Sequence, residues 1–159
     1  MARTGIVIVW GARVASEDGW SGKIRGAFLA PRTGHVTHIL VQRGLFWNAS
    51  PAAFTLNGVQ QGEDDLLMLR SGANSSSPGR GSVRMSEKTH VSIAGESAAL
   101  QGLIVDQSTG APHYILARYN LETKAVRSSL VQNITSGSPS IRMTQAEAAG
   151  LPLYRPNSV

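Results

Sequence analysis

The segment GAFLAPRTGHVTHIL at residues 26–40 returns, without a gap, as GLIVDQSTGAPHYIL at residues 102–116. The identical positions are Gly26/Gly102, Thr33/Thr109, Gly34/Gly110, Ile39/Ile115 and Leu40/Leu116. Apolar side chains also alternate around the shared glycine, at Ile24 and Phe28 in one copy and at Leu100 and Ile104 in the other. A period of two is typical of a strand with one buried face. The repeat therefore predicts two copies of one small β unit.

The two copies are separated by the sequence SGANSSSPGRGS at residues 71–82, which contains no large apolar side chain. Gly and Ser give the backbone many conformations, and no burial is available here to offset the loss of that freedom. We therefore expect a flexible linker outside both cores. It divides the chain into a first unit at residues 1–70 and a second unit at residues 83–159.

Each unit contains short runs with strand character, bounded by turn residues. In the first unit the predicted strands are 5–10, 12–16, 22–30, 35–43, 54–60 and 65–70; in the second they are 82–86, 89–93, 99–106, 112–119, 125–133 and 139–143. Helix is scarce, although Thr144 and Glu147 form a capping box that Gly150 follows. Short strands of this kind favour closed sheets. We predict an all-β fold of two tandem six-stranded β-barrels with a short helix at the C-terminus.

The order of features in each copy resembles the PRC-barrel family. The residues that carry the resemblance are Val14, Gly26, Thr33-Gly34 and Ile39–Val41 in the first copy, and Val91, Gly102, Asp106–Gly110 and Ile115-Leu116 in the second. The resemblance implies a small barrel like those of the photosynthetic reaction-centre H subunit and of a ribosome-maturation factor, and a role in the assembly of larger complexes. Gly34 and Gly110 are then the turn glycines, and Asp106 is the carboxylate that caps the second turn. The first copy has Ala30 at that position, so its hairpin must close without this cap.

Composition excludes several classes of protein. Apolar residues make up 42% and charged residues 16% of the chain, which is typical of a folded domain. The absence of cysteine excludes disulfide scaffolds and thiolate chemistry. The longest apolar run, Ile6–Trp10, is far too short to span a membrane, and the N-terminus has no signal-type segment. We expect a soluble cytoplasmic protein with no membrane span.

The residues give no catalytic constellation. His35 and His38 would project to opposite faces of one strand, which disfavours a shared metal ion. The acidic cluster Glu63-Asp64-Asp65 is better explained as a turn than as a calcium site. No nucleophile-elbow or phosphate-cradling motif occurs. We expect no enzyme activity, no metal and no cofactor.

The residues favour association through apolar surface, because chains of about 70 residues bury only ~60% of their unfolded surface. The candidate partner-binding residues are Leu45, Phe46, Trp47, Leu151, Leu153 and Tyr154. The rings of Trp10, Trp20 and Trp47 could instead close the ends of a barrel. The expected partner is another protein or a second copy of the chain, which would give a homodimer.

RNA is the alternative partner. The net charge is +5 and the pI is near 10.2, values that suit a polyanion. The basic residues are scattered, however, and no two of them are adjacent. A mildly basic solvated surface is therefore the better interpretation of the charge.

Overall fold

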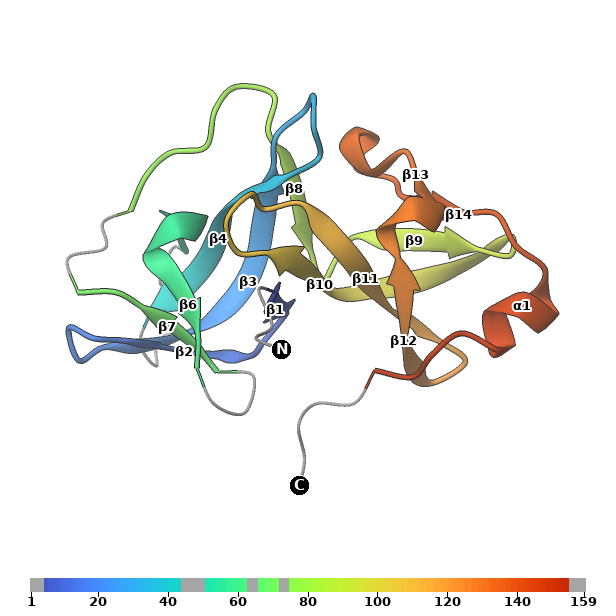
Figure 1. Cartoon of the computed structure of the whole chain (residues 1–159), viewed down its shortest axis with the longest axis horizontal. Coiled ribbons are helices and arrows are strands. Elements are labelled where there is room, and N and C mark those ends of the chain that lie inside the picture. Colours follow the sequence, from blue (N-terminus) through green and yellow to red (C-terminus); the bar gives the residue numbers. More distant parts are fainter. Residues whose placement is uncertain (1–4, 44–50, 63–65, 72–74, 155–159) are drawn as a thin grey trace.

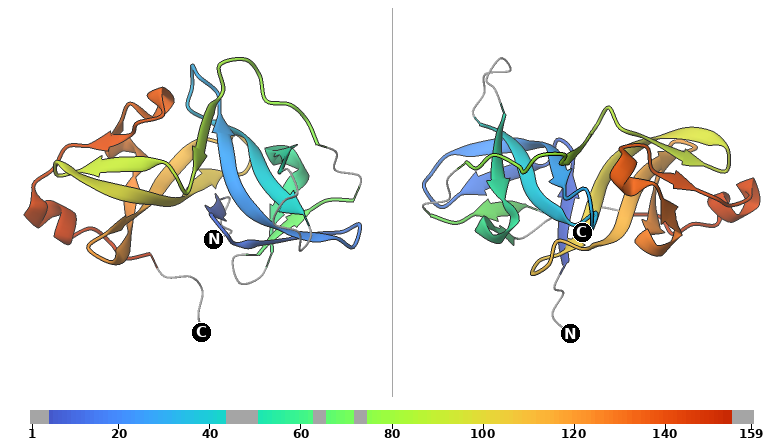
Figure 2. Two further views of the ribbon diagram at one scale, coloured as in Figure 1. Left: turned by 180° about the vertical axis from the view of Figure 1, so that it is seen from behind. Right: turned by 90° about the horizontal axis from the view of Figure 1, so that it is seen from above.

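The computed structural model describes residues 5–43, 51–62, 66–71 and 75–154. Within these ranges the architecture is all-β, with two curled sheets, short 3-10 turns and one α-helix near the C-terminus (Figure 1). Seen from behind and from above, the two sheets lie side by side along the long axis of the molecule (Figure 2). The predicted all-β class and C-terminal helix are confirmed, and the two curled half-barrel sheets are consistent with the two small barrels that we predicted. In the described ranges each sheet has seven strands and not six, because each also contains a strand of the other repeat. None of the helices in the described ranges is long and apolar enough to cross a membrane.

The first sheet consists mainly of strands from the first repeat, in the order β5-β4-β3-β2-β7-β6. Its strands are β2 (Arg13–Ser16), β3 (Ser21–Leu29), β4 (Val36–Arg43), β5 (Ala52–Thr55), β6 (Val59–Gln61), β7 (Leu67–Leu69) and β8 (Val83–Ser86), the last paired with β3. A 3-10 turn at Leu56–Gly58 interrupts the single strand that we predicted at 54–60. Asn57-Gly58 is itself a turn signal, and the Thr55 hydroxyl donates to Asn57 Oδ1 at 2.6 Å.

The second sheet repeats this plan, in the order β12-β11-β10-β9-β14-β13. Its strands are β1 (Gly5–Val9), β9 (His90–Ile93), β10 (Glu96–Asp106), β11 (Pro112–Tyr119), β12 (Glu122–Arg127), β13 (Val131–Gln132) and β14 (Ser140–Ile141), with β1 paired to β10. Further 3-10 turns lie at Ser128–Leu130 and Ile134–Ser136, and the helix α1 spans Gln145–Ala149. The predicted capping box is present, because Thr144 Oγ1 accepts from Glu147 N and Glu147 Oε1 accepts from Thr144 N, both at 3.1 Å.

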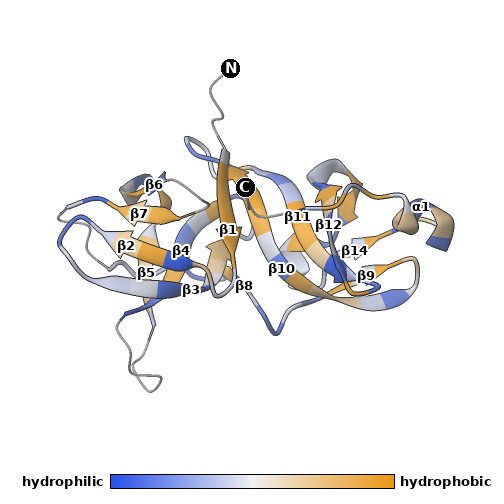
Figure 3. Ribbon diagram, turned by 90° about the horizontal axis from the view of Figure 1, so that it is seen from below, coloured by the Kyte–Doolittle hydropathy of each residue, from blue (hydrophilic) through white to orange (hydrophobic). Residues whose placement is uncertain are grey.

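The two repeats exchange their first strands. Strand β1 runs antiparallel to β10 of the second repeat, with Gly5 opposite Asp106 and Val9 opposite Gly102. Strand β8 runs antiparallel to β3 of the first repeat, with Leu29 opposite Val83. Figures 1 and 3 show both strands at the junction between the sheets.

The sheets therefore do not follow the expected division into units at 1–70 and 83–159. This difference has a physical reason. The alternation of apolar residues tells which face of a strand is buried, but it does not tell which neighbour the strand pairs with. A tight corner after β1 passes the chain into the other sheet: Trp10 N donates to Gln101 O at 2.9 Å, and Gly11 N donates to Ile24 O at 2.7 Å.

Glycine at positions 26 and 102 allows the exchanged strands to approach. Each lies at a bulge, where the register of β3 with β4 or of β10 with β11 shifts. A Cβ on Gly26 would lie 2.6 Å from the Met85 carbonyl oxygen of β8. A Cβ on Gly102 would overlap the Ile8 carbonyl oxygen of β1. The identical glycines of the repeat thus accommodate the strand that comes from the other copy.

One continuous core runs through both sheets. Ile6 and Ile8 of β1 are fully buried, and Met85 of β8 is 1% exposed. They belong to the same apolar cluster as Leu29 of the first repeat and Leu103 of the second. The hydropathy colouring shows β1 as an apolar strand between the two halves (Figure 3). Burial of these exchanged side chains is a main source of cohesion between the repeats.

Later segments of the chain lie along the edge strands β5 and β12 and form backbone hydrogen bonds with them. Ser76 N donates to Ala53 O of β5 at 2.8 Å, so part of the 71–82 linker lies against the first sheet. At the second sheet, Ala125 N of β12 donates to Pro152 O, and Tyr154 N donates to Thr123 O, both at 2.9 Å. Covered edges cannot pair with strands of other molecules.

Candidate functional site

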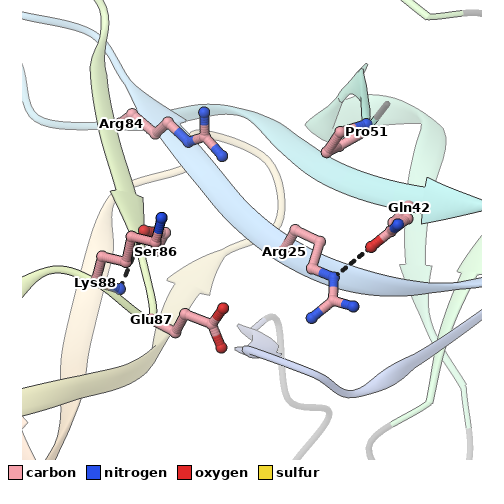
Figure 4. Close-up of a pocket in the computed structure, with 7 residues that line it drawn as sticks. All are labelled: Arg25, Gln42, Pro51, Arg84, Ser86, Glu87 and Lys88. Carbon is pink, nitrogen blue, oxygen red and sulfur yellow. Dashed lines mark hydrogen bonds between the residues drawn. The ribbon is translucent and has the colours of Figure 1, made fainter. Parts of the chain in front are cut away.

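The exchanged strand β8 forms one wall of a charged pocket on the outer face of the first sheet. The pocket has a volume of about 490 Å³, and its lining residues are Arg25, Gln42, Pro51, Arg84, Ser86, Glu87 and Lys88 (Figure 4). Alternation along the strands places these side chains outward. Ile24, next to Arg25, and Met85, between Arg84 and Ser86, point into the core instead and are buried. The pocket thus combines strands β3 and β4 of the first repeat with β8 of the second.

Positive charge dominates this pocket. Arg25 Nε donates to Gln42 Oε1 at 2.7 Å, which holds the guanidinium in place (Figure 4). Within the described part of the chain, neither Arg25, Arg84 nor Lys88 has a carboxylate oxygen within 4.0 Å. Glu87 is the one acidic residue among those that line the pocket. The three cations are therefore available to an anionic ligand.

A groove of about 420 Å³ with both apolar and hydroxyl side chains lies next to the charged pocket. Its lining residues are Phe28, Leu40, Pro51, Ala52, Ala53, Ser75, Ser76, Ser77 and Pro78. Pro51 lines both spaces, so the two are neighbours on one face of the sheet. We call the two together the outer groove. It offers cations at one end, and apolar side chains beside the hydroxyls of Ser75–Ser77 at the other.

The second sheet does not repeat this arrangement of charge. The pairing of β8 with β3 matches that of β1 with β10, because Ser86 lies opposite Gly26 as Val9 lies opposite Gly102. By this correspondence, Gln101 takes the place of Arg25. Val7 and Gly11 take the places of Arg84 and Lys88. The same pairing of strands therefore forms in the second sheet without the three cations.

The structure describes only some of the residues that we predicted to bind a partner through apolar surface. Leu45, Phe46 and Trp47 lie outside the described residues. Leu151 is half-buried against the core, Tyr154 is half-buried, and Leu153 is 42% exposed on the segment that pairs with β12. Trp10 and Trp20 pack against the core, and the Arg43 guanidinium lies 4.2 Å from the centre of the Trp20 ring.

The turn residues lie at equivalent hairpins. Gly34 and Gly110 have φ of +72° and +77°, the left-handed conformation that favours glycine. Asp106 Oδ1 accepts from Ser108 Oγ at 2.6 Å, from Ser108 N at 2.9 Å and from Thr109 N at 3.0 Å. These hydrogen bonds lower the pKa of Asp106 to about 2, and the bond from the Ser108 hydroxyl has the largest effect. The first hairpin closes with the backbone bond from Gly34 N to Ala30 O at 2.9 Å.

The histidines do not come together. His38 is buried, its Nδ1 lies 2.8 Å from Thr37 Oγ1, and its Nε2 has no hydrogen-bond partner. Burial lowers the pKa of His38. His113 instead lies 3.7 Å from the Asp106 carboxylate. In the described ranges, no group of three or more His, Asp or Glu side chains could hold a metal ion.

Sequence reasoning missed the outer groove. Arg25 and Arg84 are 59 positions apart and looked like scattered surface charges. Only the pairing of β8 with β3 brings them to one face. The available signal was the comparison of the two copies, in which the arginines have neutral counterparts.

No family model matches the chain, and no curated protein matches it.

Proposed function

We propose that the chain is a non-enzymatic protein-interaction module, built from two PRC-barrel-like repeats, which binds a partner protein in the outer groove. The observation that carries the proposal is the juxtaposition, on one face, of unpaired cations with a groove lined by apolar and hydroxyl side chains. Protein interfaces combine an apolar centre with charged groups that set orientation. The repeated Thr-Gly hairpins and strand order support the family assignment within this proposal.

A second copy of the chain is one candidate partner, and the exposed Leu153 would take part in such a homodimer. RNA is the second candidate ligand, favoured by the net charge of +5. These cases differ in their response to salt. RNA binding weakens steeply as salt is added, because bound counterions are released from the phosphates. The affinity of a contact through apolar surface depends much less on the salt concentration.

The test uses Ala53→Gln, which places a long neutral side chain in the apolar part of the groove. Ala125→Gln is the matched control, because Ala125 lies opposite Leu116 as Ala53 lies opposite Leu40. We expect affinity capture from native-host cells, after nuclease treatment, to recover one partner with the wild type and with Ala125→Gln. Recovery should fall with Ala53→Gln while its circular dichroism spectrum is unchanged. Equal recovery with Ala53→Gln, or a partner that is recovered only when the nuclease treatment is left out, would overturn the proposal.

A further inference from the structure

We infer that the charged end of the outer groove binds carboxylate side chains from an acidic segment of the partner protein. This inference rests on the proposed function, and it adds the chemistry of the ligand. It follows from three features of the pocket: the identity of its cations, the character of the adjoining groove, and the asymmetry between the two sheets.

The cations are suited to carboxylates. Arg25 is held by Gln42 through its Nε, which leaves its terminal nitrogens for a ligand. A guanidinium presents parallel donors that match the two oxygens of a carboxylate. Arg84 and Lys88 lie on the neighbouring strand and the corner after it, on the same face. Three cations against the single Glu87 leave an excess of two positive charges among the lining residues.

The side chains of the adjoining groove favour a peptide over a polyphosphate chain as the ligand. Phe28, Leu40 and Pro78 provide apolar surface beside the cations, and Ser75–Ser77 provide hydroxyl groups. An extended segment with alternating acidic and apolar residues could satisfy both ends at once. A polyphosphate chain fits less well, because the apolar side chains at the other end of the groove offer no charge to its phosphates.

The asymmetry between the sheets argues that the cations serve a ligand. The corresponding positions of the second sheet hold Gln101, Val7 and Gly11, and the same strand pairing forms there. The same strand pairing therefore forms in the second sheet without cations at the counterparts of Arg25, Arg84 and Lys88. A cluster of unpaired positive charges also costs some free energy through mutual repulsion.

The test measures binding of a fluorescein-labelled peptide of alternating Glu and Leu to the full chain, by fluorescence anisotropy. We expect Arg25→Gln with Arg84→Gln to weaken binding about tenfold, since two partly exposed charge contacts are lost. The matched control is Arg118→Gln with Arg127→Gln, which removes the same charge from exposed positions on the second sheet. The control should change affinity less than about twofold. Amide NMR shifts on peptide addition should cluster on β3, β4 and β8.

Three results would overturn the inference: no binding of the Glu-Leu peptide, equal weakening by the two double variants, or tighter binding of a single-stranded RNA oligonucleotide to the same residues. Its failure is distinguishable from failure of the proposed function. If Ala53→Gln still abolishes partner capture while the Glu-Leu peptide does not bind, only the acidic character of the partner is refuted. If capture does not depend on Ala53, the interaction module itself is refuted.

Discussion

At the scale of single residues, the glycine at position 102 allows strand β1 of the first repeat to lie close to β10 of the second. An added methyl group there would meet the backbone of β1 at the Ile8 carbonyl and the Val9 Cα, and backbone cannot move aside as a flexible side chain can. We predict that Gly102→Ala lowers the free energy of unfolding by about 3 kcal/mol. Urea denaturation measures this loss.

Gly79→Ala is the control for that substitution, because nothing lies within 4 Å of its added Cβ. It should leave the denaturation midpoint unchanged or raise it slightly. Gly26→Ala should cost less than Gly102→Ala, since its closest contact is a single carbonyl oxygen at 2.6 Å. A Gly102→Ala variant as stable as the wild type would show that β1 does not need this close approach.

A second residue-scale prediction concerns His38. Burial lowers its pKa in the folded chain below the ordinary value of 6.5, so the unfolded chain takes up the proton more readily. The folded state is therefore fully favoured above pH 6.5 and loses stability as the pH falls from 6.5 toward the folded pKa. His38→Gln should flatten the dependence of the melting temperature on pH between 7 and 5. His90→Gln, at an exposed position, should leave that dependence in place.

At the scale of elements, Lys124 fixes the C-terminal segment onto the second sheet. Its Nζ is buried and donates to Ala149 O at 3.2 Å, at the end of α1, and to Leu151 O at 3.4 Å. Glu122 Oε1 lies 3.9 Å away. The cation thus satisfies carbonyls that a helix end leaves without partners.

We predict that Lys124→Met lowers the free energy of unfolding by about 1–2 kcal/mol, because charge-assisted bonds to two carbonyls are lost. Amide hydrogen exchange should speed up in α1 and at residues 151–154, and not in the first sheet. Lys23→Met, at an exposed position of β3, is the control and should change neither quantity. Unchanged exchange in α1 would show that β12 holds the segment by backbone bonds alone.

The two central hairpins could be predicted from the sequence, whereas the sheet that each exchanged strand joins could not. The Thr-Gly pairs and the period-two faces located β3, β4, β10 and β11, because both signals depend on local backbone geometry. The exchange of β1 and β8 depends instead on which sheet edge each strand reaches. The charged pocket was missed for the same reason, since Arg84 meets Arg25 only through that exchange.

At the scale of the whole molecule, strand exchange makes the repeats depend on each other for folding. Without β8, the first sheet would expose the edge of β3 beside Ala27 and Leu29. Without β1, the second sheet would expose the edge of β10 beside Leu103 and Val105. All four of these side chains are buried in the intact chain.

We predict that fragments 1–78 and 79–159 fail to fold separately and that mixing them yields one folded 1:1 complex. The cut lies before Gly79, which is exposed and contacts nothing through an added Cβ. Circular dichroism and analytical ultracentrifugation check both statements. Two fragments that each melt cooperatively alone would show that the expected units at 1–70 and 83–159 are independent after all.

The exchange also has a consequence for how the chain is made. Strand β1 is synthesised before its partner residues Gly102–Asp106, which follow their opposite residues by 93 to 101 positions. At translation rates of about 5–20 residues per second, that delay is on the order of 5–20 s. Ile6 and Ile8 are fully buried in the folded chain, but during this delay β10 is not yet present to cover them. A nascent chain that stalls before residue 102 therefore carries an open apolar strand, the kind of surface that chaperones bind and that aggregation begins from.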